Sequence, residues 1–482
     1  MQELYDYQFL DLKKIVFQNT STIILGRVIN LLLSVISSVL IVRYLGSERL
    51  GQYASLYAYL TLFGWLTMFG MDIIIVRDAS KQREKAGQLF GTATSVSFLL
   101  SVVATILAML GSITLNYTNA LRMLLFVAAI DMLLLAPLRL SGSVFQVNLK
   151  PWYGTGINVA RQALWVMVIG VLIFAKAGLA SIIRAHLLCS VIESLALFLF
   201  ARRFIPFRWH FNVSLARNIL KESWPIALSI LAVSVYQRID QVMLHTLAGN
   251  QKLGYYVASV NISELFDIFG IALLFAMFPI LSKVALQQER FEYYVKICFR
   301  YLMPFIFGIC AIVTVGSGPL IKILYGKEYV LSGPVLSVLI WSEAGSFLGM
   351  IIGIALIARG LQKFTLISAS VGAVVNVILN IAFIPKWGPV GAAWATVISY
   401  SLSGFFLFLL FPSARYLWVM GAKESFIPLF IGLSCVAILN SLGKLLALTL
   451  MPILYIGGLL ALRVWNSNDV RMLFGALFRN KE

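Results

Sequence analysis

Charged side chains are scarce in this sequence. Only 12% of its 482 residues are Asp, Glu, Lys or Arg, whereas about a quarter of a soluble globular protein is charged. Apolar runs of eighteen or more residues recur along the whole chain, and each is long enough to cross the hydrocarbon core of a bilayer. This pattern excludes water-soluble enzyme folds. It predicts an all-α polytopic membrane protein, because open sheet edges cannot exist in lipid.

Histidine and cysteine are also few. The chain has three histidines and four cysteines, and the cysteines lie inside apolar segments without the spacing of metal ligands (Cys189, Cys298, Cys310 and Cys435). We interpret the cysteines as small buried apolar residues. The sequence therefore predicts no metal centre and no bound cofactor.

Acidic residues are outnumbered by basic ones. Asp and Glu number 20 against 38 Lys and Arg, which gives a formal net charge of +18. In a membrane protein such an excess favours contact with anionic lipid headgroups rather than with nucleic acid, so we expect no nucleic-acid partner. Connections predicted to lie inside carry more than twice the Lys and Arg of those outside. This asymmetry places both termini in the cytoplasm.

The apolar runs predict about fourteen transmembrane helices with an internal repeat. "RLGQYASLYAYL" (Arg49–Leu60) opens the second helix, and the similar "KLGYYVASVNIS" (Lys252–Ser263) opens the eighth. An even number of helices separates the two motifs, which implies two parallel, pseudo-symmetric six-helix lobes around a central cavity, plus two C-terminal helices. The predicted parts are an N-lobe over 1–200, a cytoplasmic linker over 201–222, a C-lobe over 223–412, and two last helices with a cytoplasmic tail over 413–482.

Several motifs resemble a known family. "LIVRYLGSERLGQY" (Leu40–Tyr53), "WPIALSILAVSVYQRIDQVML" (Trp224–Leu244), "YGKEY" (Tyr325–Tyr329) and "NVILNIAFIPKWGPVGAAWATVIS" (Asn376–Ser399) occur in the order seen in polysaccharide and O-antigen flippases. These flippases belong to the multidrug/oligosaccharidyl-lipid/polysaccharide (MOP) exporter superfamily. The resemblance covers nearly the whole chain.

The resemblance implies a transporter, not an enzyme. It implies a flippase that moves polyprenyl-diphosphate-linked oligosaccharide to the outer leaflet of a prokaryotic cytoplasmic membrane by alternating access, for surface polysaccharide biosynthesis. Membrane lipids, a polysaccharide polymerase and other assembly proteins would be its partners, and Na⁺, H⁺ or the membrane potential would drive it. Two alternatives stay open: a cation-coupled multidrug exporter of the same superfamily, and, more remotely, a membrane polymerase or glycosyltransferase. The absence of a long extramembrane loop disfavours the polymerase or glycosyltransferase.

Charged residues inside the predicted helices are the candidate site, because an intramembrane charge usually faces a cavity or a partner. Arg161 and Glu193 lie sixteen residues either side of the turn at Ala177, so at 1.5 Å per residue they share one depth. The same count places Arg238 level with Glu264. Each arginine is thus either a structural ion-pair partner or a substrate contact.

Arg27 has no acid at its level in its own hairpin. It forms one polar stripe with Asn30, Ser34, Ser37 and Ser38. We therefore favour Arg27 as the main phosphate contact of the N-lobe, with Asn30, Arg161 and Arg238 as further cavity residues.

The predicted C-lobe is richer in acid. Asp240 lies two residues after Arg238 and points roughly opposite to it, and Asp267 lies one helical turn beyond Glu264. We expect Asp240, Glu264 and Asp267 to serve in cation or proton coupling or in ion pairing, as Glu193 does in the N-lobe.

Overall fold

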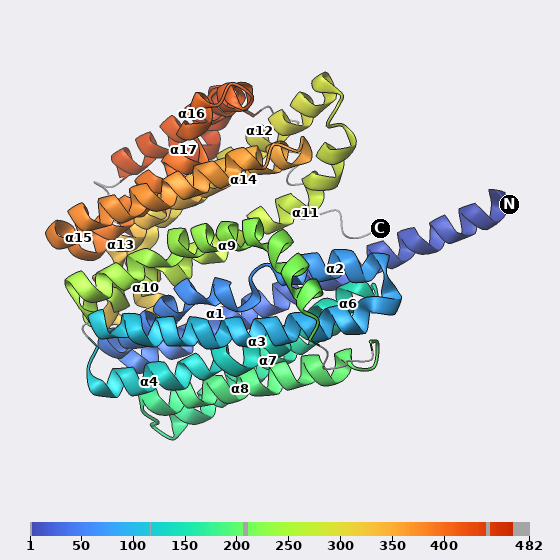
Figure 1. The fold of residues 1–482 in the computed structure, drawn as a ribbon. Coiled ribbons are helices and arrows are strands. Elements are labelled where there is room, and N and C mark those ends of the chain that lie inside the picture. The colour runs from blue at the N-terminus through green and yellow to red at the C-terminus, as the bar shows by residue number, and fades with distance from the viewer. Residues whose placement is uncertain (1, 116, 206–210, 440–443, 466–482) are drawn as a thin grey trace. The chain divides into compact units, whose positions relative to one another are not determined.

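The computed structural model describes residues 2–115, 117–205, 211–439 and 444–465. All secondary structure in these ranges is helical (Figure 1). The chain divides into two compact units, Met1–Val242 (unit 1) and Met243–Glu482 (unit 2).

The described residues of unit 1 form nine α-helices, the last of which continues into unit 2. Short 3₁₀ turns and one π-helical turn, Asp131–Leu135, join some of them. The helices are α1 (Gln2–Met68), α2 (Met71–Lys81), α3 (Ala86–Gly111), α4 (Asn119–Ile130), α5 (Ala136–Arg139), α6 (Ser143–Val147), α7 (Trp152–Phe174), α8 (Leu179–Ala201) and α9 (Val213–Ala248).

Unit 2 continues with eight α-helices in its described residues. They are α10 (Asn250–Ser263), α11 (Asp267–Lys283), α12 (Gln288–Tyr325), α13 (Ser332–Leu339), α14 (Trp341–Ala358), α15 (Lys363–Gly404), α16 (Arg415–Leu439) and α17 (Lys444–Ala461). The Tyr455 hydroxyl of α17 donates a hydrogen bond of 2.7 Å to the Pro304 carbonyl of α12. The predicted last two helices are therefore anchored on the body of unit 2.

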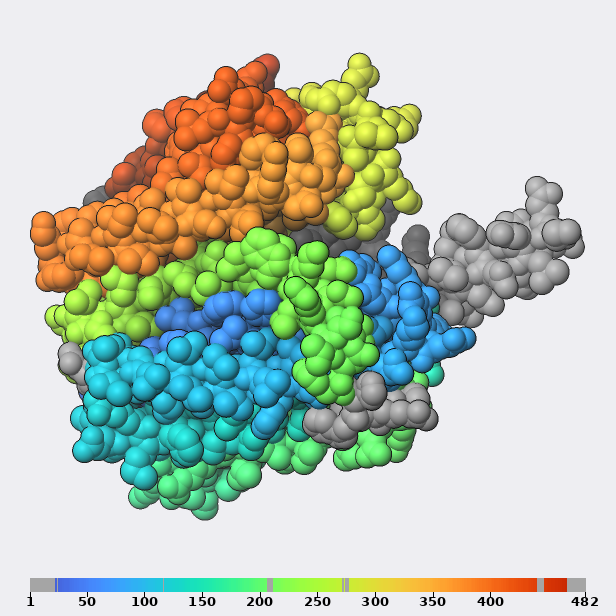
Figure 2. Space-filling view, in the orientation of Figure 1, coloured from blue at the N-terminus to red at the C-terminus, as the bar shows by residue number. Residues whose placement is uncertain are grey.

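Ten described helical segments are long and apolar enough to cross a membrane. The side chains of α3 illustrate their surfaces, since they lie exposed on unit 1 in Figure 2. Apolar side chains of α3 that are more than 40% exposed are Phe98, Leu99, Val103, Ile106, Leu107 and Leu110. Such faces are expected against lipid. They confirm the predicted all-α polytopic membrane protein, while the count of fourteen crossings stays a prediction.

Two of these long segments each contain a break at glycine. Gly46 in α1 has φ 70° and ψ 170°, and Gly388 in α15 has φ 56° and ψ −131°. A residue with a side chain rarely adopts such positive φ values, so glycine allows the chain to change direction there. Each of α1 and α15 thus consists of two helices, and the break in α1 falls just before Arg49, where the second predicted helix opens.

The first turns of α9 pack on unit 1. Ala216 and Ile219 join an apolar core that includes Met71 and Phe90, and Arg77 of α2 forms an ion pair with Glu222. Pro225 lies inside α9, which bends along its length in Figure 1. Part of the predicted linker, from Val213 onward, is therefore helix. Residues 206–210 of that linker lie outside the described residues, and the predicted lobe boundaries stay a prediction.

Candidate functional site: an ionic cluster in unit 1

Arg161 lies in the middle of α7, carries the one charged side chain of that helix, and faces Glu193 of α8. Arg161 Nε is 3.5 Å from Glu193 Oε2, and the two side chains are 20% and 10% exposed. α7 and α8 are regular helices joined by a short turn, so residues equally far from the turn lie at the same depth. The distance agrees with the predicted pair.

A second guanidinium reaches the same carboxylate. Arg139 of α5 donates to both oxygens of Asp131, with Nη1–Oδ2 at 3.0 Å and Nη2–Oδ1 at 2.8 Å. Its Nη2 also lies 3.7 Å from Glu193 Oε2. We call Asp131, Arg139, Arg161 and Glu193 the ionic cluster. Its two guanidinium groups balance its two carboxylates.

The π-helical turn explains why Asp131 and Arg139 can meet. In an α-helix eight residues advance by ~800°, which leaves their side chains about 80° apart. The turn absorbs one extra residue, because the Ala136 amide donates to the Asp131 carbonyl five residues back. The rotation falls to about 700°, and both side chains share a face. Pro137 follows directly and lacks the amide that a regular α-helical bond would need.

Sequence reasoning missed Arg139 for this reason. Arg139 lies near the end of an apolar run, where a basic residue is expected in the connection outside the membrane. The structure instead continues the apolar segment to Val147. The sequence signal that could have revealed Arg139 was Pro137, which marks a break in regular helix spacing between Asp131 and Arg139.

Polar side chains connect the ionic cluster to α1. Arg161 Nη2 donates to Gln162 Oε1 at 2.8 Å, and Gln162 Nε2 donates to Ser37 Oγ at 3.1 Å. Gln162 and Ser37 are both buried. One end of the predicted α1 stripe, at Ser37, is therefore linked to the ionic cluster through Gln162.

Aromatic side chains lie beside the cluster in the same unit. The Tyr57 hydroxyl shares a hydrogen bond of 3.1 Å with His186 Nδ1, and the Trp165 ring meets the His186 ring edge-on at 5.0 Å between centroids. Tyr53 packs on Tyr57. His186 is thus a polar contact between helices.

Arg27 and Asn30 lie at the other end of the α1 stripe. Arg27 is exposed, and Asn30 is half-buried. Because Arg27 precedes Ser37 by ten residues, it lies ~15 Å from Ser37 along the axis of α1.

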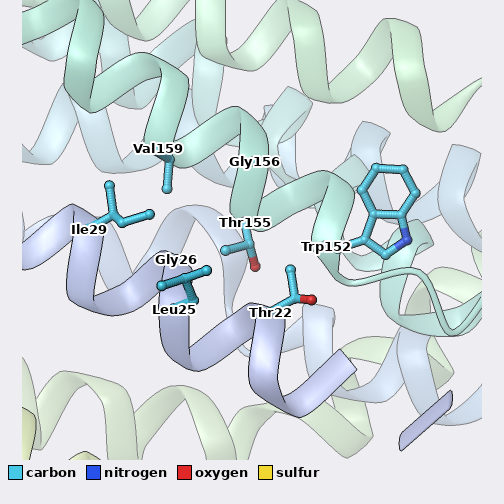
Figure 3. A pocket seen from close by; sticks show the side chains of 8 residues that line it. All are labelled: Thr22, Leu25, Gly26, Ile29, Trp152, Thr155, Gly156 and Val159. Carbon is cyan, nitrogen blue, oxygen red and sulfur yellow. The ribbon is translucent and has the colours of Figure 1, made fainter. Parts of the chain in front are cut away.

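A groove of about 670 Å³ lies between α1 and α7 near this end (Figure 3). Gly26 and Thr155 meet there so closely that a Cβ on Gly26 would lie 2.2 Å from Thr155 Cγ2. Small residues at such points let two helices approach within a membrane. The described residues that line the groove are all uncharged: Thr22, Leu25, Gly26, Ile29, Trp152, Thr155, Gly156 and Val159.

Arg238 and Asp240 lie on α9, in unit 1. Asp240 is buried, and its Oδ1 accepts a hydrogen bond of 2.7 Å from the Gln241 amide. Glu264 and Asp267 belong to unit 2, where Glu264 is exposed and Asp267 half-buried. The predicted pair of Arg238 and Glu264 would join the two units and stays a prediction.

Buried polar contacts in unit 2 have a different character. The Ser263 hydroxyl donates to Glu343 Oε1 at 2.7 Å. In α15, Asn380 Nδ2 donates to Asn376 Oδ1 at 2.8 Å, and Asn376 Nδ2 donates to Ser399 Oγ at 3.0 Å. Neutral amides and hydroxyls thus hold the two parts of α15 together.

Comparisons with known proteins give both sequence relatives and solved structures with a similar fold. A family described as "Polysaccharide biosynthesis protein" matches residues 40–334. A Shigella dysenteriae protein named for O-antigen transport is 33% identical over 37% of this chain and 44% of its own length. The capsular polysaccharide biosynthesis protein CapF of Staphylococcus aureus is 22% identical over 51% of this chain and 63% of its own length. The chain thus spans less than two thirds of each relative.

Solved structures share the fold. The lipid II flippase MurJ in an inward closed conformation superposes with a TM-score of 0.73 at 15% identity, covering 94% of this chain and 99% of that one. An inward-facing multidrug resistance MATE family transporter of the MOP superfamily gives 0.63 at 16% identity, covering 83% and 95%. At these identities the likeness shows the fold alone. It confirms the predicted MOP-type helical architecture.

Proposed function

The chain belongs to the polysaccharide biosynthesis protein family, as its motifs predicted, and on this premise we propose that it is a flippase for lipid-linked oligosaccharide. Its substrate would be a polyprenyl-diphosphate-linked oligosaccharide. The protein would move this lipid from the cytoplasmic to the outer leaflet of a prokaryotic cell membrane, for surface polysaccharide biosynthesis.

The observation that carries the proposal is Arg161, a guanidinium held at mid-helix and 20% exposed. A charged side chain at the centre of a transmembrane helix costs about 2.5–3.5 kcal/mol on insertion scales, so it is retained for a purpose. Guanidinium stays charged at all physiological pH values and binds phosphate oxygens in pairs. Arg27 and Arg238 would add further contacts to the diphosphate.

The energetics of the membrane support outward movement of such a lipid. With the cytoplasm negative, each negative charge that moves outward gains ~2.3 kcal/mol per 100 mV. The membrane potential could therefore drive an anionic headgroup outward by alternating access, with Na⁺ or H⁺ coupling through the unit 2 acids as an additional source.

A multidrug exporter is the competing function, because the fold is shared with both a flippase and a drug transporter. The two functions differ in the charge of their cargo. An anionic headgroup requires guanidinium contacts, whereas a cationic drug does not. Neutralising Arg161 should therefore abolish the first activity and spare the second.

The test is a deletion strain in which lipid-linked oligosaccharide is extracted and quantified. We expect the intermediate to accumulate and surface polysaccharide to disappear, and the wild-type gene to restore both. Arg161→Ala should fail to restore them, whereas Arg184→Ala, an exposed arginine on α8, should succeed. Normal surface polysaccharide in the deletion strain would rule out the proposed function.

A further inference from the structure

Glu193 is the most loosely held member of the ionic cluster. Its Oε2 lies 3.5 Å from Arg161 Nε and 3.7 Å from Arg139 Nη2, both beyond the usual 2.7–3.2 Å of an N–H···O hydrogen bond. The other contacts are shorter. Arg139 binds Asp131 at 2.8 and 3.0 Å, and Arg161 donates to Gln162 at 2.8 Å. Charge, rather than a short hydrogen bond, therefore holds Glu193 between two guanidinium groups.

Arg139 has donor capacity left for this carboxylate. A guanidinium carries five N–H donors, and the two bonds to Asp131 use two of them. Its Nε is buried and has no hydrogen-bond partner in the part of the chain that the structure describes. Because Asp131 fixes the plane of the guanidinium, Arg139 offers a preformed place to which Glu193 can move.

A substrate anion at Arg161 would compete with Glu193. If the carboxylate stayed in place, it would repel the incoming phosphate. If it left without a partner, a largely buried charge would be uncompensated, which is strongly unfavourable. Movement of Glu193 toward Arg139 would remove the repulsion and keep the carboxylate paired. The movement is short, because Glu193 lies almost equally far from the two arginines.

We propose that Glu193 is an exchangeable counter-ion, which leaves Arg161 for Arg139 when a diphosphate group binds Arg161. Arg139 is then a positioning residue that acts on substrate binding only through Glu193. The inference rests on the proposed function, since it assigns the diphosphate of that substrate to Arg161. Without substrate, the charges of the ionic cluster balance and Glu193 is paired with Arg161.

The test uses purified full-length protein in detergent, with farnesyl diphosphate as the probe and farnesol as the uncharged control. Arg161→Gln should weaken farnesyl diphosphate binding about tenfold or more. Glu193→Gln should strengthen it about threefold to tenfold, because the competing carboxylate is gone. Arg139→Gln should weaken it about threefold to tenfold, because Glu193 then stays on Arg161. Farnesol binding should not change.

The double variant Arg139→Gln/Glu193→Gln decides how Arg139 acts. If Arg139 works through Glu193, the double variant should bind like Glu193→Gln alone, so the two effects should not add. Arg139→Lys keeps the charge and should restore part of the affinity. Arg184→Gln, on the exposed side of α8, should bind like wild type.

A purely structural role predicts a different pattern. Weaker binding in both Glu193→Gln and Arg139→Gln, or no change in either, would overturn the exchange. Melting temperatures identify a misfolded variant. If Glu193→Gln misfolds, Glu193→Asp takes its place in the test. Its shorter side chain weakens the ion pair with Arg161, so farnesyl diphosphate should bind about twofold more tightly. If Arg161→Gln loses farnesyl diphosphate binding but Glu193→Gln and Arg139→Gln do not change it in opposite directions, the exchange is overturned. The flippase proposal would still stand in that case, because the deletion strain tests it separately.

Discussion

In unit 1 the carboxylates of Asp131 and Glu193 lie against two guanidinium groups, whereas in unit 2 Glu343 accepts a hydrogen bond from the neutral Ser263 hydroxyl. The two arrangements respond differently to substitution. Loss of one member of an ion pair leaves a charge without compensation, while an amide can replace a carboxylate beside a hydroxyl. Acids alone do not therefore indicate a site, and the cations beside them decide what they can do.

The largest effect that would test this contrast is expected from Arg161. Arg161→Ala removes a guanidinium able to make paired hydrogen bonds to phosphate, each worth about 1.5–3 kcal/mol. We expect export of lipid-linked oligosaccharide to fall about a hundredfold, measured as surface polysaccharide in the complemented deletion strain. Equal loss in Arg184→Ala would show that the assay reports general damage to α8 or its neighbours.

A smaller loss is expected from Arg27→Ala. Arg27 is exposed on α1 and is not a member of the ionic cluster, so it would supply one contact to the substrate and its removal should leave the cluster intact. We expect export to fall about tenfold while protein insertion, followed by immunoblot of membranes, stays normal. Unchanged export would remove Arg27 from the proposed substrate contacts.

A smaller effect is expected on the stability of the protein when an ion pair of unit 1 is weakened. Asp131→Asn leaves Arg139 with a weakened partner, and the two side chains are 26% and 30% exposed, so screening by solvent moderates the loss. We expect the free energy of unfolding to fall by about 1–2 kcal/mol, seen as a lower melting temperature in detergent. A melting temperature equal to wild type would mean that the bidentate pair contributes nothing to stability.

The smallest effect is expected from Glu343→Gln in unit 2. The glutamine amide oxygen can still accept from Ser263, so we expect the free energy of unfolding to change by less than about 1 kcal/mol. Melting curves recorded beside those of Asp131→Asn make the comparison direct. A larger loss in Glu343→Gln than in Asp131→Asn would reverse the contrast between the units.

Regular helices made part of the site predictable. Apolar run lengths predicted the membrane helices, and counting from the turn at Ala177 placed Arg161 beside Glu193, because α7 and α8 rise uniformly. Arg139 was not predictable in this way, since the π-helical turn breaks the uniform rotation on which counting depends. The start of α9 was also not predictable from the sequence, because its packing on the rest of unit 1 depends on tertiary contacts such as that of Arg77 with Glu222.

The π-helical turn makes the chain tolerant of a change in length. Asp131 and Arg139 face each other although eight residues separate them, because one residue of the turn adds nothing to the net rotation. In a shortened chain lacking Leu134, the remaining seven residues would advance by about 700° at regular helix spacing, so the same side chains would again share a face, with one helical hydrogen bond still missing at Pro137. Gain or loss of a single codon at this point could thus occur in evolution while the ion pair survives.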